Sequence, residues 1–341
     1  MTKNNFYNLD NTEKEAIFQA IASKKGMTPF AVEKDWWVTQ LLSVIFKMEI
    51  ADYMIFKGGT SLSKAWKIID RFSEDIDLAI DRSFFDFDGD ISVRAVGRLR
   101  KTSNEFIINH FYPSLQKHFE EKGFRDIFWE IDLSGKPEED PVKIFLSYPK
   151  IISSPGYMLP AIQIELGCRS LREPYTVKTF GSLVDEMLPD KGFSTSFISV
   201  PTANPEKTFL EKLFLLHEEF HRPPQKIRVN RLSRHLYDVF HLSKTIYATK
   251  ALEDEQLYKT IVAHRYKFSR VGGVDYNKHH PNMLNPIPIK DVINVWKMDY
   301  AKMLEEMIYE ENAPTFEDLI DNLSELRHKL QSIKWDYDLI L

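Results

Sequence analysis

The hexapeptide Asp75–Ile80 constrains the fold more than any other segment, because apolar residues recur at every second position. Such alternation predicts a β-strand in which the isoleucines and Leu78 share one face. Asp75 and Asp77 then share the other face, with Cα atoms roughly 6.5–7 Å apart. Neighbouring carboxylates repel each other unless a cation lies between them, and Mg²⁺ is commonly bound by one or two carboxylates together with substrate phosphates. The segment is therefore either a solvated strand face or part of a metal site.

A pair of glycines precedes this strand. The apolar run 53–56 predicts a short buried strand, and a helix is expected over 61–69. Between them, glycines let the backbone approach a ligand, and the first N–H groups of a helix attract an anion. An ordinary strand-to-helix turn is the alternative, since the Walker pattern of phosphate-binding loops is absent. The candidate nucleotide-binding residues are Gly58, Gly59, Thr60, Ser61 and Lys64.

A third carboxylate comes from the segment 160–167, which is also expected to form a strand. Its alternation places Glu165 on the face opposite the isoleucines. If this strand lies beside Asp75–Ile80, Glu165 completes a three-carboxylate cluster suited to a two-metal clamp for phosphoryl or nucleotidyl transfer. The alternative is that Glu165 forms an ion pair with Arg169 or Arg172, which are close in sequence.

Composition limits the remaining possibilities. The chain has 341 residues, which favours about two domains. Its 45 Lys and Arg against 50 Asp and Glu give a net charge of −5, so a phosphate-bearing substrate must be held by a local basic patch or through metal ions. A single cysteine, Cys168, excludes an intramolecular disulfide and a cysteine-based zinc site. No apolar segment resembles a signal peptide or a membrane span, so we expect a cytoplasmic protein.

The remaining pattern divides the chain near residue 200. We expect an α/β domain over 1–200, with N-terminal helices, and an all-helical domain over 201–341 that completes the active-site cleft. Helices are expected over 11–25, 29–47, 91–122, 206–220, 231–247, 253–267, 290–310 and 315–333, and further strands over 127–133 and 142–148. Thr28-Pro29 is a start signal for the second of these helices, and a loop is expected around Pro201 and Pro205. The predicted fold class is α+β.

Two later helices carry further candidates. Lys212 lies at the edge of an apolar stripe, where its ammonium group can reach a triphosphate, although a surface lysine is the alternative. Asp238 lies four residues after Arg234, so a surface ion pair is the alternative to a role in the site. The segment between these helices is rich in basic residues, and it either guides an RNA substrate or is a solvated loop. Its candidate RNA contacts are Arg222, Lys226, Arg228 and Arg231.

Together these motifs resemble the AbiEii/AbiGii toxin family of nucleotidyltransferases. Residues 57–78 follow the pattern K-G-G-T-S-L-S-K-x(6)-R-F-S-E-D-I-D-L. The earlier segment V-E-K-D-W-W-V-T at 32–39 and the later elements E-K-L at 211–213 and R-H-L-Y-D at 234–238 are also similar to family motifs. His235 stands where the family has its first aspartate in the last of these motifs.

The resemblance implies a DNA polymerase β-type domain in which the glycine turn binds the nucleotide phosphates and Asp75 and Asp77 hold metal ions. Lys212 and Asp238 would be later active-site residues, and Glu165 is our candidate for the third carboxylate. The expected activity is Mg²⁺-dependent transfer of an NMP from an NTP to tRNA or another RNA, with two Mg²⁺ ions. The expected role is the toxin of a toxin–antitoxin or phage-exclusion pair with a cognate antitoxin partner. A glycosyltransferase using a nucleotide sugar and a non-catalytic binding module are the alternatives.

Overall fold

The computed structural model describes residues 6–133, 140–154, 161–168, 174–189, 191 and 197–335. It divides the chain into two compact units, which are described separately. Unit 1 comprises Met1–Lys67 and Arg71–Ala203, and unit 2 comprises Ile68–Asp70 and Asn204–Leu341. The main division thus falls between residues 203 and 204, against an expected boundary near residue 200. That the second domain completes an active-site cleft stays a prediction.

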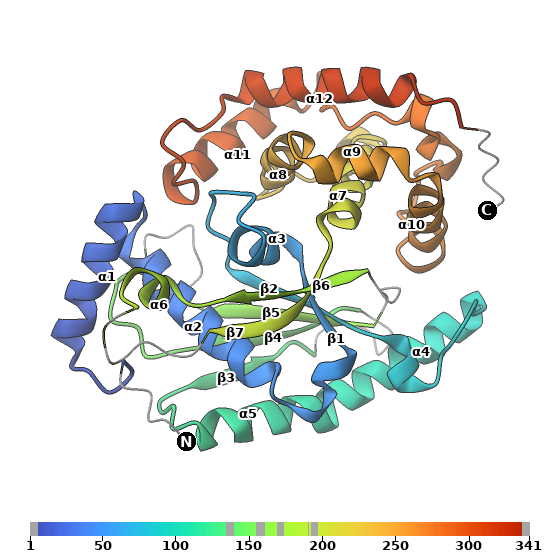
Figure 1. The fold of residues 1–341 in the computed structure, drawn as a ribbon. Helices are drawn as coiled ribbons and strands as arrows, with labels where there is room; N and C mark the ends of the chain where they lie inside the picture. The colour runs from blue at the N-terminus through green and yellow to red at the C-terminus, as the bar shows by residue number, and fades with distance from the viewer. Residues whose placement is uncertain are drawn as a thin grey trace. The chain divides into compact units, whose positions relative to one another are not determined.

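Unit 1 contains a seven-stranded mixed sheet, and the predicted α+β class is confirmed (Figure 1). The strands are β1 (Met54–Lys57), β2 (Asp75–Ile80), β3 (Phe128–Ile131), β4 (Val142–Ser147), β5 (Ile162–Gly167), β6 (Tyr175–Phe180) and β7 (Ile198–Ala203). Their order is β3-β4-β5-β2-β1-β7-β6. The β2–β5 and β1–β7 pairs are parallel and the other pairs antiparallel. Strands β2 and β5 are therefore neighbours, which was the condition for Glu165 to lie beside the two aspartates.

The alternation in β2 and β5 divides apolar from polar side chains as predicted. Ile76 and Leu78 of β2 and Ile164 of β5 are fully buried and belong to one hydrophobic core with helices α2 (Pro29–Ile45) and α5 (Tyr112–Glu121). Asp75, Asp77, Gln163 and Glu165 are half-buried on the other face. The sheet thus packs its apolar face on helices and leaves the carboxylates on the opposite face, where α3 (Gly58–Thr60) lies (Figure 1).

The helices of unit 1 begin and end at residues that favour helix termini. Thr28 Oγ1 accepts a hydrogen bond from the Ala31 N–H at the start of α2, and Gly26 ends α1 in the left-handed conformation. The α-helices are α1 (Asn11–Lys25), α2 (Pro29–Ile45), α3 (Gly58–Thr60), α4 (Val93–Phe106), α5 (Tyr112–Glu121) and α6 (Leu183–Met187). The 3₁₀-helices are η1 (Glu49–Tyr53) and η3 (Arg82–Phe85), and the π-helical turns are η2 (Ser61–Ala65) and η4 (Ile107–Phe111).

Among the strands and α-helices of unit 1, three were not predicted, namely β6, α6 and β7. Strand β7 contains Pro201, which suggested a loop, yet Pro201 pairs with Val177 of β6. The helix expected over 61–69 begins earlier, at Gly58, and ends at Ala65. Lys67 is in the left-handed region, with φ 54°, which prevents the helix from continuing to residue 69.

Unit 2 is helical in its described part. Its α-helices are α7 (Pro205–Phe220), α8 (Arg234–Ser243), α9 (Ile246–Glu253), α10 (Glu255–Phe268), α11 (Ile293–Glu306) and α12 (Phe316–Gln331), with 3₁₀-helices η5 (Pro224–Lys226), η6 (Tyr276–His279) and η7 (Pro281–Met283). The single helix expected over 231–247 is wrong, because α8 ends at Ser243 and α9 begins at Ile246. Across the described residues of both units, no helix has the length and apolar character needed to cross a bilayer.

Candidate active site

The glycine turn and the β2 carboxylates of unit 1 are packed directly against each other. Gly58 has φ +76°, and a Cβ added there would lie 1.8 Å from Oδ2 of Asp77. Both the backbone conformation and the space therefore require glycine at this position. The close approach joins two motifs that the sequence could only place in order along the chain.

The rest of the turn is held by buried polar groups. A Cβ added to Gly59 would lie 2.5 Å from Nη2 of Arg71 and 2.8 Å from Oγ of Ser73. Arg71 is almost completely buried, and its Nη1 donates to the Phe72 carbonyl. The carboxylate of Asp77 thus packs against Gly58, and the guanidinium group of Arg71 packs against Gly59. The sequence did not indicate that Arg71 belongs to the site.

The two hydroxyl groups predicted to donate to phosphate are used within the turn. Thr60 Oγ1 donates to the carbonyl oxygen of Asp75, and Ser61 Oγ donates to that of Gly58 at 2.9 Å. Both residues are buried. The hydroxyls therefore connect the start of the helix to β2 and to the glycines, and phosphate binding by them stays a prediction.

Lys64 is also engaged by the protein itself. Its ammonium group forms an ion pair with Oδ1 of Asp35 in α2, while Oδ2 of Asp35 accepts a hydrogen bond from the Leu183 N–H at 2.7 Å. Burial raises the pKa of Asp35, and the pairing with Lys64 opposes that rise. Lys64 thus connects the helix after the glycine turn to α2 and α6, and a phosphate contact from it is untested.

The residue before Asp35 makes the corresponding connection to β2. Lys34 Nζ lies 2.6 Å from Oε2 of Glu74, and both side chains are buried from solvent. Glu74 immediately precedes Asp75, so this pair joins α2 to the beginning of the carboxylate strand. Removing one partner of such a pair leaves a buried charge uncompensated, so it favours a single position of the strand relative to the helix.

Four charged residues form a row across the polar face of the sheet. The register pairs Lys57 of β1 with Asp77 of β2, Asp77 with Glu165 of β5, and Glu165 with Lys143 of β4. Lys143 Nζ lies 4.0 Å from Oε1 of Glu165, and Gln163 Nε2 donates to the same oxygen at 2.8 Å. The two lysines offset the repulsion between the neighbouring carboxylates. They were missed because strand order, which local alternation does not encode, brings them to the row.

The register places Glu165 beside Asp77, but the three carboxylates do not form a closed metal cage. Within the described ranges from 6 to 335, no three His, Cys, Asp or Glu side chains form a group that could hold a metal ion. The Glu165 carboxylate is instead engaged by the hydrogen bond from Gln163 and the ion pair with Lys143. Arg169 and Arg172, the alternative partners of Glu165, lie outside the described residues. Binding of Mg²⁺ by Asp75 and Asp77 together with substrate phosphates stays a prediction.

Unit 2 brings Lys212 of α7 and Asp238 of α8 together. Lys212 Nζ lies 2.8 Å from Oδ2 of Asp238, and Nδ1 of His235 lies 3.4 Å from the same nitrogen. The Asp238 side chain is fully buried and that of Lys212 is 9% exposed. Neither residue is therefore an ordinary surface charge, which was the alternative for each of them.

The basic segment that follows α7 is partly neutralised. Glu219 lies in α7 just before this segment and is 1% exposed. Its carboxylate accepts hydrogen bonds from the backbone N–H and the guanidinium group of Arg228. Arg222 Nε also lies 3.1 Å from a Glu219 oxygen. Arg231 is half-buried and donates its backbone N–H to Asp299, whereas Lys226 is exposed. The basic segment itself contains no acidic residue, but the fold places Glu219 beside two of its arginines. RNA contact by these four residues stays a prediction.

The arrangement in unit 1, a glycine turn against paired aspartates on a mixed sheet, is compatible with a nucleotide-handling enzyme. A family model described as nucleotidyl transferase AbiEii toxin of a type IV toxin–antitoxin system matches residues 40–322. The chain belongs to this family, which confirms the resemblance noted from the sequence. No protein in a search of curated sequences matches.

Proposed function

We propose that this protein is a Mg²⁺-dependent nucleotidyltransferase that moves an NMP from an NTP to an RNA acceptor such as tRNA. The observation that carries the proposal is the contact between Gly58 and the carboxylate of Asp77. It brings the backbone N–H groups at a helix start next to a pair of carboxylates, so an anionic triphosphate and its cation have partners within one turn of chain. Membership in a nucleotidyl transferase toxin family supports the same chemistry.

In this proposal Asp75 and Asp77 hold the metal ions. Glu165, beside Asp77, provides a third carboxylate when its contacts with Gln163 and Lys143 are replaced by a contact with a metal ion. Bound Mg²⁺ would supply positive charge for the triphosphate. The acceptor hydroxyl oxygen forms a bond to the α-phosphorus, the bond from that phosphorus to the β-phosphate oxygen breaks, and pyrophosphate leaves. Glu165 accepts the proton of the hydroxyl group.

The other proposed roles rest on the buried pair of unit 2 and on the family. Lys212 offers a cation for the triphosphate, and Asp238 orients it, because a lysine held at 2.8 Å by a buried carboxylate keeps a defined position. The domain of unit 1 is proposed to have the polymerase β-type arrangement. The physiological role is that of the toxin, with a cognate antitoxin that counteracts it.

Substitution of Asp77 by asparagine tests the proposal, because it removes the charge and retains the shape that packs on Gly58. The wild type should release pyrophosphate from an NTP when Mg²⁺ and total cellular RNA are present, and Asp77→Asn should lose this activity. Asp52→Asn, at an exposed position just before β1, is the matched control and should behave as the wild type. Equal release by Asp77→Asn and the wild type would refute the assignment.

A further inference from the structure

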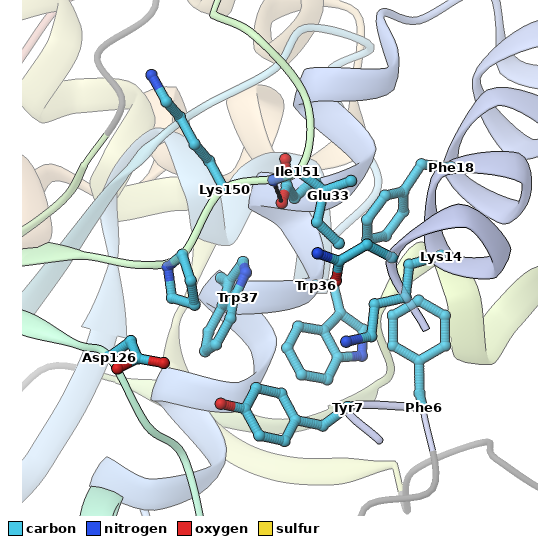
Figure 2. A pocket seen from close by; sticks show the side chains of 12 residues that line it. Phe6, Tyr7, Lys14, Phe18, Glu33, Trp36, Trp37, Asp126, Lys150 and Ile151 are labelled. Carbon is cyan, nitrogen blue, oxygen red and sulfur yellow. Dashed lines mark hydrogen bonds between the residues drawn. The ribbon is translucent and has the colours of Figure 1, made fainter. Parts of the chain in front are cut away.

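A polar and aromatic cavity lies in unit 1, between the N-terminal segment, α1 and α2. It has a volume of about 330 Å³, at the lower end of the range of small-molecule sites. Five of its lining residues carry aromatic rings, and the residues that line it include Phe6, Tyr7, Phe18, Trp36 and Trp37. Figure 2 shows these rings surrounding the space, with Lys14 reaching in from α1 and Glu33 on α2 above them. We call it the α1–α2 pocket.

Polar groups of the pocket are held in place by the surrounding structure. Both oxygens of the fully buried Glu33 side chain accept backbone hydrogen bonds, from Ile151 at 2.7 Å and Ile152 at 3.0 Å. Lys14 Nζ lies 5.3 Å from the centre of the Tyr7 ring. The indole N–H of Trp36, itself 2% exposed, has no hydrogen-bond partner within the part of the chain that the structure describes. A buried donor of this kind is costly unless a ligand or water satisfies it.

The charges around the pocket select the type of ligand. Lys14 and Lys150 offset Glu33 and Asp126, so the lining residues carry no net charge. In Figure 2 the side chain of Lys150 extends away from the rings, which leaves Lys14 as the cation beside them. Burial lowers the pKa of Lys14 and raises that of Glu33, and each opposite charge opposes the shift of the other. Such a lining disfavours a highly charged ligand and also a purely apolar one, which would leave the charges desolvated.

We propose that the α1–α2 pocket binds a nucleobase, presented by a free nucleoside or by single-stranded RNA. A base is flat and stacks on aromatic rings, and its edge carries both donors and acceptors. Acceptors on that edge match the Lys14 ammonium and the Trp36 N–H, and donors match Glu33. The small volume fits one base or nucleoside. This inference does not depend on the proposed function of the glycine turn.

Helix α2 connects the pocket with the candidate active site. Its consecutive residues Glu33, Lys34 and Asp35 contact three different segments, namely the loop at 151–152, Glu74 before β2, and Lys64 after the glycine turn. The pocket and the carboxylate strand are therefore both in contact with α2.

Calorimetric titration of the full-length protein tests the proposal. The probes are adenosine, guanosine, cytidine and uridine, which have no phosphate for the glycine turn, and a mixed-sequence RNA pentamer. We expect saturable binding of at least one nucleoside or of the pentamer, and the response of each class identifies the source of the base. Lys14→Met should weaken binding by about tenfold, because it removes a charge-assisted hydrogen bond. Lys24→Met, an exposed change on the same helix, should bind as the wild type does.

Three results would overturn the proposal. The first is no binding of any nucleoside or of the pentamer to the wild type. The second is equal binding by Lys14→Met and the wild type. The third is loss of nucleoside binding in Asp77→Asn, which would assign the binding to the glycine turn. Trp36→Phe, which keeps a ring but removes the N–H, provides a second variant, and circular dichroism verifies that both variants are folded.

Discussion

Replacing Gly58 with alanine tests whether the glycine turn is shaped by its contact with Asp77. The left-handed backbone at φ +76° costs alanine about 1–2 kcal/mol. The new Cβ would also lie 1.8 Å from Oδ2 of Asp77, so the carboxylate must move, and overpacking of this kind costs about 1–3 kcal/mol. We therefore expect Gly58→Ala to lower the free energy of unfolding by about 2–5 kcal/mol, and to lower activity because Asp77 is displaced.

Gly89→Ala is the matched control. Gly89 also has a positive φ, +65°, but nothing lies within 4 Å of the Cβ position. This variant should lose only the backbone contribution of about 1–2 kcal/mol and retain activity. Urea unfolding followed by tryptophan fluorescence measures both variants, and repeating Gly58→Ala in an Asp77→Ala background isolates the contact, since the carboxylate is then absent. Equal costs for Gly58→Ala and Gly89→Ala would refute the reasoning.

Two further predictions concern buried ionisable side chains of unit 2. Lys212→Met should lower the free energy of unfolding by about 3–5 kcal/mol in urea, because the fully buried Asp238 loses the ammonium group 2.8 Å away. The exposed change Lys226→Met should leave the free energy of unfolding almost unchanged. Similar losses for both variants would contradict the pairing. Burial, assisted by His221 and His279, lowers the pKa of His217 to about 2, so below pH 6.5 the unfolded chain binds a proton that the folded protein does not. Stability should therefore fall between pH 6.5 and 5 by about 1.4 kcal/mol per pH unit at most, and His217→Asn, which retains an acceptor for the Asn285 N–H, should flatten this dependence. Parallel pH profiles for the two proteins would exclude His217 as the cause.

The sequence predicted well those parts of the fold in which local pattern and burial agree. Strand β2 has the predicted bounds because its alternating apolar side chains are the ones the core buries. Helix α2 begins at the predicted Thr28-Pro29, since capping is a local interaction. Strand β7 was missed because Pro201 suggested a loop, although tertiary pairing with β6 tolerates it. Local rules fail where contacts with distant segments decide the conformation.

The candidate site shows the same division. Alternation alone placed Asp75 and Asp77 on one face, but the neighbour of Asp77 depended on strand order, which brought Glu165 beside it. The same order brought Lys143 to Glu165, a pairing that no local signal reveals. The family motifs suggested that Lys212 and Asp238 both belong to the site. The structure was needed to reveal the contact between them, because two residues 26 positions apart on separate helices share no periodic pattern.

The most direct test of the central claim follows the fate of the α-phosphate. The full-length protein is incubated with Mg²⁺, total cellular RNA and each NTP labelled at either the α- or the γ-phosphate. We predict that α-label becomes attached to a discrete RNA and that γ-label leaves as pyrophosphate. Asp77→Asn should neither transfer the α-label nor release the γ-label, while Asp52→Asn should behave as the wild type. Transfer of γ-label, or undiminished α-transfer by a folded Asp77→Asn protein, would contradict nucleotidyl transfer at this site.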